Sequence, residues 1–216
     1  MAKIGIGRAT LAASGLIAAM LALGAVEPGV PSGETPPVTT PAADPPPGDL
    51  LIASAQIQDP RFRRTVILIL RHDKDGAVGI VVNRPVGEHP IAELLEAAGD
   101  KDSGAEGSIR VFEGGPVQQQ LGFVVHSADY RRADTVAVDG KVAMTASKEA
   151  LRDIGRHRGP KQCFFAFGYA GWAAGQLEGE IARRDWFTIP EDLSLVFDAD
   201  RDTVWDRALA RRGQDL

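Results

Sequence analysis

Residues Cys163–Glu180 read CFFAFGYAGWAAGQLEGE, an apolar and aromatic run followed by a glycine-rich segment. The apolar start predicts a buried strand over residues 163–167. Residues 168–171 then have the composition of a turn between a strand and a helix, where free backbone N–H groups can bind an anion. Glycines at 171, 175 and 179 would share one face of a helix and let a neighbouring backbone approach closely. We therefore expect a strand, a turn and a helix, with packing as the main role of the glycines.

Short apolar runs and amphipathic stretches alternate irregularly through the rest of the chain. The runs predict strands at 50–53, 65–70, 78–82, 109–112, 121–126, 135–138, 142–144 and 193–197. Helix signals occur at 90–99, 147–156 and 200–213, which with the glycine-rich segment makes about four peripheral helices. Because strands and helices do not alternate regularly, the pattern predicts an α+β fold with a mainly antiparallel or mixed sheet. An Asp-Gly corner at residues 75–76 predicts a hairpin.

The N-terminal part of the chain differs from the rest in composition. Residues 1–26 begin with basic side chains and continue as an uncharged apolar stretch, which is typical of a signal peptide or an N-terminal membrane anchor. Residues 27–48 hold more than half of the 14 prolines and predict an extended, disordered linker. Residues 49–213 then form a single domain. We expect a periplasmic or inner-membrane-anchored protein, with contact to a membrane only through the leader; a misassigned start would make it cytoplasmic.

Charge and cysteine content restrict the function. The formal net charge is −5, with 29 acidic and 24 basic side chains, so the chain lacks the positive field that supports nucleic-acid binding. The single cysteine, Cys163, cannot form an internal disulfide and lies in an apolar run, where a buried, unreactive thiol is expected.

The common catalytic and metal motifs do not occur in the sequence. A Gly-x-Ser-x-Gly elbow is missing, and His72, His89, His126 and His157 show no two-ligand spacing. We therefore predict no catalytic residues, no metal site and no cofactor. Glu178 and Glu180 diverge on a helix, so they do not form an acid–base pair, and we expect them at a solvated edge.

A ligand site is predicted from turns that follow strands. Asn83-Arg84-Pro85 and Gly114-Gly115-Pro116 are turns of this kind, and an Arg84 guanidinium beside an aromatic wall would bind a carboxylate or phosphate. The candidate ligand-binding residues are Asn83, Arg84, Gly114, Gly115, His126, Tyr169, Gly171 and Trp172. The expected partner is a small anionic ligand or a protein.

Several sequence blocks together resemble the AlgH/YqgE family over about residues 48–213. They are Leu50–Ala53, Asp59–Val66, Gly76–Pro85, Gly114–Val117, His126 and Gly168–Trp172 with Gly175–Glu178. The resemblance implies coiled sheets that form a barrel-like core. It implies no defined activity, because members are labelled as regulators of alginate synthesis or of transcription. The leader, the Pro-rich segment and Ser54-Ala55-Gln56, where the family has Met-Pro, depart from the pattern.

Three functions follow from these observations. The first is a non-catalytic binding or regulatory protein of the cell envelope. The second is a hydrolase-like enzyme acting on a small anionic substrate, with His126 as base and Arg84 as anion holder. The third is a cytoplasmic transcriptional regulator, which the acidic charge opposes.

Overall fold

The computed structural model describes residues 10–11, 44–100, 104–197 and 200–212. The predicted leader, except for residues 10–11, and the Pro-rich segment up to residue 43 lie outside the described residues. The strands are β1 (Thr10–Leu11), β2 (Leu50–Ala53), β3 (Val66–Asp73), β4 (Gly76–Val81), β5 (Pro85–Pro90), β6 (Ser108–Glu113), β7 (Val117–Ser127), β8 (Thr135–Ala137), β9 (Val142–Thr145), β10 (Cys163–Ala173) and β11 (Trp186–Ile189). The helices are α2 (Ile91–Ala97), α3 (Lys148–Ile154), α4 (Gln176–Ala182), α5 (Leu193–Phe197) and α6 (Val204–Arg212).

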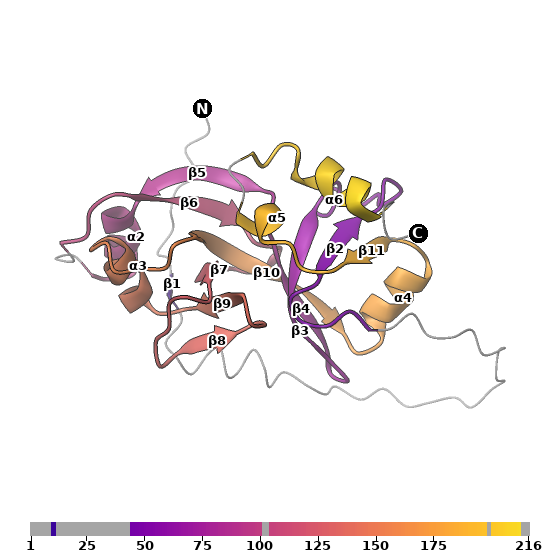
Figure 1. Ribbon diagram of the computed structural model, residues 1–216, viewed down its shortest axis with the longest axis horizontal. Coiled ribbons are helices and arrows are strands. Elements are labelled where there is room, and N and C mark those ends of the chain that lie inside the picture. The colour runs from indigo at the N-terminus through magenta and orange to yellow at the C-terminus, as the bar shows by residue number, and fades with distance from the viewer. Residues whose placement is uncertain (1–9, 12–43, 101–103, 198–199, 213–216) are drawn as a thin grey trace.

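The strands form one curled sheet in the order β11-β2-β3-β4-β10-β7-β9-β8, and β5 and β6 branch from it at β10 (Figure 1). Most neighbouring strands are antiparallel; β6–β10 and β1–β7 are parallel. In Figure 1, α2 and α3 lie at one end of the molecule and α4 lies at the other. The predicted α+β class with a barrel-like, mainly antiparallel core is confirmed as a half-barrel with five helices in the described part of the chain. None of these helices is long and apolar enough to cross a membrane.

The long strand β10 joins the two halves of the sheet. Its first part lies between β6 and β7, where Phe165 is level with Val111 of β6 and Val124 of β7. Its second part pairs with β4, where Trp172 lies opposite Ala77. One strand thus takes part in two half-sheets, and the curl of the molecule follows from its path.

Alternating side chains along the strands feed three separate core clusters, because successive residues point to opposite faces of a sheet. On β2, Leu50 and Ile52 face the inner core, which α5 and α6 cover, whereas Leu51 and Ala53 face a second core beneath α4. A third core lies between the other half-sheet and helices α2 and α3. Helix α4 therefore caps the face of this half-sheet to which Trp172 points, whereas α5 and α6 cover its opposite face.

Gly168 marks the point at which β10 passes from one half-sheet to the other. Its φ is +70°, and the register with β7 shifts between Phe167 and Tyr169. A Cβ at this position would lie 2.9 Å from the backbone oxygen of Val117 and closer still to that of Gly115. Only glycine combines this φ with such a close backbone approach. Packing therefore explains Gly168, although the segment is a strand and not a turn. The close backbone approach predicted at Gly171, Gly175 and Gly179 is wrong, because Gly171 lies on β10 and an added Cβ at the three positions meets no neighbouring backbone atom.

Within the described residues from 44 onwards, two expectations about secondary structure are wrong, and two strands were missed. Residues 168–173 continue β10 and do not form a strand-to-helix turn, because β7 pairs with Tyr169 and β4 pairs with residues 170–173. Residues 193–197 form the helix α5 and not a strand, since the Asp192 side chain accepts a hydrogen bond from the Ser194 N–H at 2.8 Å and starts a helical turn. The missed strands are β5, whose sequence has a proline at each end and a glycine between them, and β11, which lies just after α4.

The end of the Pro-rich segment is packed on the domain. The described residues 44–48 place Pro45 and Gly48 in buried positions, and the Gly48 N–H donates to the Ile69 carbonyl at 2.9 Å. Residues 44–48 therefore belong structurally with the domain that follows them.

Candidate functional site

Asn83 and Arg84 are held by the backbone of the segment before β3. Asn83 accepts a hydrogen bond from the Val66 N–H at 2.8 Å and donates one to the Arg64 carbonyl at 2.8 Å. The Arg84 guanidinium donates to the Pro60 carbonyl at 3.0 Å, so it holds the loop that contains Pro60. Asn83 thus fills a structural role, while Arg84 remains partly exposed next to the loop that carries Asp59.

Gly114 and Gly115 meet the bend of β10 directly. The Gly114 N–H donates to the Phe167 carbonyl at 2.8 Å, and a Cβ on Gly115 would lie 2.5 Å from the Ala170 nitrogen. Gly115 and Tyr169 are therefore in contact through their backbones. The structure brings these predicted site residues together, but their backbones are in direct contact and leave no room for a ligand between them.

His126 lies in the interior, away from the other candidates. Its side chain is 0% exposed and is bonded to the Ser127 carbonyl and the Thr145 hydroxyl, both at 2.9 Å. Burial lowers the pKa of this imidazole below its usual value. His126 lies on β7, where it is level with Cys163 of β10, nine residues before Trp172. Because a substrate cannot reach His126, the expected common groove with His126 as base is not formed.

Trp172 and Gly171 line a cleft of about 240 Å³ between β10, α4 and the loop after β2. Its other lining residues are Ile57, Asp59, Arg61, Phe62, Gln176, Glu180, Asp185 and Trp186. The indole ring of Trp186 meets the phenyl ring of Phe62 and the indole ring of Trp172 edge to face, with ring centroids 5.6 and 6.0 Å apart. The cleft thus has an aromatic wall, as the sequence suggested for Trp172. Its charged groups are three carboxylates and one guanidinium, so the wall borders an acidic site.

Glu180 fixes both indoles of this wall. One carboxylate oxygen, Oε2, accepts the indole N–H of Trp172 at 2.8 Å and that of Trp186 at 2.7 Å. The other, Oε1, accepts from the Gln176 amide at 2.9 Å. The expectation of a solvated Glu180 is wrong, since this carboxylate organises the cleft from a half-buried position. Two tryptophans at similar distances on either side of an acidic residue were the sequence signal that could have revealed it.

Arg61 and Asp59 form the rim of the same cleft. They make a forked ion pair, with Asp59 oxygens 2.7 and 3.1 Å from the guanidinium nitrogens, and the guanidinium lies 5.8 Å from the Phe62 ring centroid. The side-chain hydrogen bond from Arg61 lowers the pKa of the Asp59 carboxyl. A cation is therefore already accommodated against one edge of this aromatic wall.

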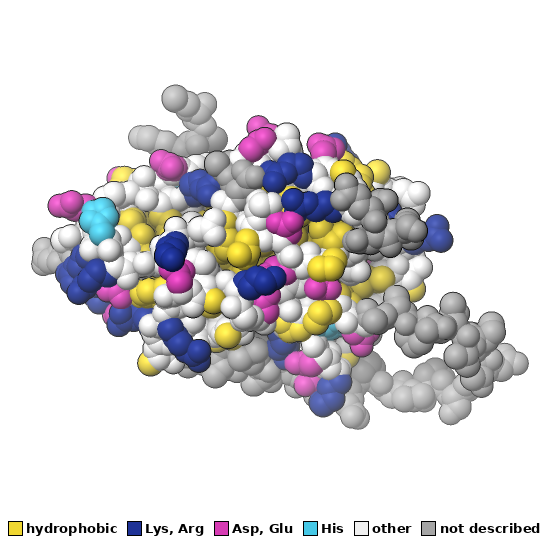
Figure 2. All heavy atoms as spheres, in the orientation of Figure 1, with side chains coloured by type: hydrophobic (Ala, Val, Ile, Leu, Met, Phe, Trp, Pro, Cys, Tyr) yellow, Lys and Arg dark blue, Asp and Glu magenta, His cyan; other side chains and the backbone are white. Residues whose placement is uncertain are grey.

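A second cleft, of about 450 Å³, lies around α3 at the opposite end of the molecule. It is lined by Arg132, Glu149, Arg152, Asp153, Arg156 and Arg158. Within it, Arg152 pairs with Asp100 at 2.6 Å and with Glu149 at 2.8 Å. On the face shown in Figure 2, basic and acidic side chains are interspersed among the described residues and do not gather into one basic surface. The arginines are thus in large part neutralised by their neighbours.

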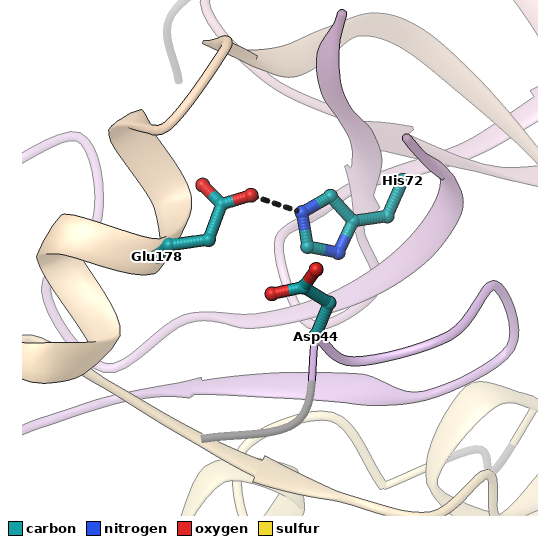
Figure 3. A group of neighbouring side chains, drawn as sticks. All are labelled: Asp44, His72 and Glu178. Atoms are coloured by element: carbon teal, nitrogen blue, oxygen red, sulfur yellow. Dashed lines mark hydrogen bonds and ion pairs between the residues drawn. The ribbon is translucent and has the colours of Figure 1, made fainter. Parts of the chain in front are cut away.

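Two further groups concern reactivity and metals. Burial raises the pKa of the Cys163 thiol to about 11, which keeps it protonated and unreactive as a nucleophile. Asp44, His72 and Glu178 place one ligand atom each within 4.8 Å of one another (Figure 3). Sequence spacing gave no signal for this group, because His72 and Glu178 are 106 residues apart.

Comparison with known proteins identifies the family. The sequence profile described as AlgH-like matches residues 50–216. A UPF0301 protein of Methylococcus capsulatus is 43% identical over 169 residues, covering 78% of this chain and 92% of the relative. The chain belongs to the AlgH-like family. The solution structure of the AlgH protein from Pseudomonas aeruginosa is similar, with a TM-score of 0.66 and 34% identity over 82% of this chain and 93% of that protein.

A crystal structure of a Corynebacterium diphtheriae protein has the same fold, with a TM-score of 0.59 and 24% identity over 78% of this chain and 87% of that one. The AlgH-like match spans every element from β2 to α6 and therefore both clefts. Asp44 precedes the matched residues, so the group in Figure 3 joins the AlgH-like domain to the segment before it.

Proposed function

We propose that this AlgH-like protein is a non-catalytic binding protein of the cell envelope that takes a cationic side chain of a protein partner into the Trp172 cleft. The main support is the position of Glu180, whose carboxylate accepts hydrogen bonds from Trp172, Trp186 and Gln176. All three donors are neutral, and the described residues give its carboxylate no cationic partner, so its negative charge remains available at the aromatic wall.

The hydrogen-bond capacity of Glu180 supports a further ligand contact. An ionised carboxylate offers about four acceptor positions. Three are used within the cleft, two on Oε2 and one on Oε1. A Lys or Arg side chain would donate to the remaining position while its stem lies along Phe62, Trp172 and Trp186.

The envelope location rests on the leader-like composition of residues 1–26. Mass analysis of the mature N-terminus after fractionation of native cells tests it. A chain that begins near residue 26 in the periplasm, or an intact chain held at the membrane, supports this location. An intact cytoplasmic chain contradicts it.

A second candidate is a small anionic ligand in the arginine cleft around α3. Its lining has four arginines and two carboxylates, and Asp100 pairs with one of the arginines, so the excess positive charge that would favour an anion there is small. The two candidates predict opposite charge preferences at opposite ends of the molecule, so one titration separates them.

The test is an NMR titration of the full chain with two capped tripeptides that differ only in a central arginine or glutamate. The protein has three indole N–H groups, and that of Trp205 donates to the buried Ala53 carbonyl at 2.8 Å. We expect the arginine peptide to shift the signals of Trp172 and Trp186 and to leave that of Trp205 unchanged. The Glu180→Gln variant should bind at least about tenfold more weakly, because it loses the charge.

Glu178→Gln is the matched control, since it makes the same change two residues away on the same helix. Its affinity for the arginine peptide should equal that of the unmodified protein. Equal affinities for the unmodified protein and Glu180→Gln would refute the cleft assignment. Shifts with the glutamate peptide at α3 would favour the anionic candidate.

A further inference from the structure

His72 sits between the end of the Pro-rich segment and α4, and only 3% of its side chain is exposed. Its Nδ1 atom lies 3.0 Å from the Pro45 carbonyl oxygen, and its Nε2 atom lies 2.9 Å from Oε1 of Glu178. Asp44, the neighbour of Pro45, places a carboxylate oxygen within 4.8 Å of the ligand atoms of the other two (Figure 3). Three elements distant in sequence thus meet at one imidazole.

Both ring nitrogens of His72 face oxygens that can only accept. A neutral imidazole has one N–H, so it can donate to the Pro45 carbonyl or to the Glu178 carboxylate but not to both. The remaining nitrogen lone pair then points at an oxygen lone pair. His126 shows the contrasting case: its Nδ1 faces a carbonyl, but its Nε2 faces the Thr145 hydroxyl, which can donate. The surroundings of His72, unlike those of His126, call for an additional positive charge.

A metal cation satisfies this geometry. Histidines that bind metals commonly donate their second ring N–H to a backbone carbonyl, which fixes the ring and directs the other nitrogen to the metal. Here the Pro45 carbonyl is the acceptor for the Nδ1–H group of His72, and Nε2 points to Glu178. The second carboxylate oxygen of Glu178, Oε2, is buried and has no hydrogen-bond partner among the described residues, so it too is free to bind a cation.

We propose that His72 Nε2, Glu178 and Asp44 form a site for a divalent first-row transition metal. One imidazole and two carboxylates are ligands that suit Zn²⁺ and Mn²⁺, whereas Mg²⁺ prefers oxygen ligands and retained waters. In a tetrahedral zinc site, bonds of about 2.1 Å separate neighbouring ligand atoms by about 3.4 Å, so His72 and Glu178 need to part by only about half an ångström. Asp44 is exposed, which leaves a path for the metal from solvent.

The metal would fasten the Pro-rich segment to the domain. Asp44 is the first described residue of that segment, and Pro45 and Gly48 are buried against the fold. With His72 on β3 and Glu178 on α4, the site would tie the segment to two elements of the AlgH-like domain. It does not depend on the function proposed for the Trp172 cleft, because none of its ligands lines that cleft.

The test is isothermal titration calorimetry of untagged full-length protein, first stripped with a chelator, with ZnCl₂, MnCl₂ and MgCl₂. We expect one Zn²⁺ per chain with at least tenfold higher affinity than Mg²⁺. Asp44→Asn changes an exposed side chain outside the core, so it should fold normally and weaken Zn²⁺ binding at least tenfold. Glu178→Gln should weaken it at least as much, and Glu180→Gln should leave it unchanged.

Cobalt substitution adds a direct readout of the ligands. Co²⁺ bound in the site should give visible absorption bands that are lost in Glu178→Gln and retained in Glu180→Gln. Zn²⁺ binding that is unaffected by both Asp44→Asn and Glu178→Gln would overturn the assignment. Failure of the stripped protein to bind Zn²⁺, Mn²⁺ or Co²⁺ would also overturn it and would leave His72 and Glu178 as a hydrogen-bonded pair only.

Discussion

The bend of β10 at Gly168 gives the most direct test of how the two half-sheets are joined. Replacing Gly168 with alanine places a Cβ within 2.9 Å of the Val117 carbonyl oxygen at a φ of +70°. The neighbouring atoms are backbone, so they cannot rotate away. The left-handed backbone costs about 1–2 kcal/mol for a non-glycine residue, and overpacking adds about 1–3 kcal/mol.

The expected loss in the free energy of unfolding is therefore about 2–5 kcal/mol, out of a total of about 5–15 kcal/mol for a typical domain. Gly175→Ala is a matched control, because Gly175 has a φ of +75° and an added Cβ there meets no atom within 4 Å. Gly175→Ala carries only the backbone cost of about 1–2 kcal/mol. The difference between the two variants isolates the close contact between β10 and the Gly115–Val117 segment.

Urea unfolding followed by far-ultraviolet circular dichroism measures both values. With a slope of about 2 kcal/mol per molar urea, Gly168→Ala should lower the midpoint by about 1 M or more. If the two variants lose the same free energy of unfolding within about 0.5 kcal/mol, β10 and the Gly115–Val117 segment do not pack as closely as described. The reasoning about the joint between the half-sheets would then be refuted.

Two further predictions separate structural from functional roles. Asn83→Ala should lower the free energy of unfolding by about 2 kcal/mol, because it removes the hydrogen bonds to the Val66 N–H and the Arg64 carbonyl. It should leave the affinity for the arginine peptide unchanged. An unchanged urea midpoint would contradict this structural role. Because burial lowers the pKa of His126 in the folded state, the unfolded chain binds the proton more readily, and stability should fall as pH drops below about 6.5. The thermal midpoint should therefore fall more between pH 7.5 and 5.5 in the unmodified protein than in His126→Gln, and parallel curves would exclude this contribution.

Local patterns were sufficient to predict most strands but not their connections. The short apolar runs of β2, β3 and β4 and the Asp-Gly corner predicted these strands and the β3–β4 hairpin, in which Asp73 pairs with Gly76. The length of β10 could not be predicted, because its residues 170–173 are paired with β4, which lies about 90 residues earlier. Likewise, residues 193–197 are an apolar run that forms the helix α5, where Asp192 accepts hydrogen bonds from Ser194 through its side chain and from Leu195 and Val196 through its carbonyl.

The two carboxylates of α4 show why the candidate sites were harder to predict than the fold. Their spacing of two residues implies that they diverge on a helix, and they do: Glu178 meets His72, and Glu180 meets two indoles. The Glu180 contacts are local, since Trp172 lies eight residues before it and Trp186 six residues after it. That arrangement was visible in the sequence. The Glu178 contact joins residues 106 positions apart and depends on how β3 and α4 pack together, so only a three-dimensional structure could reveal it.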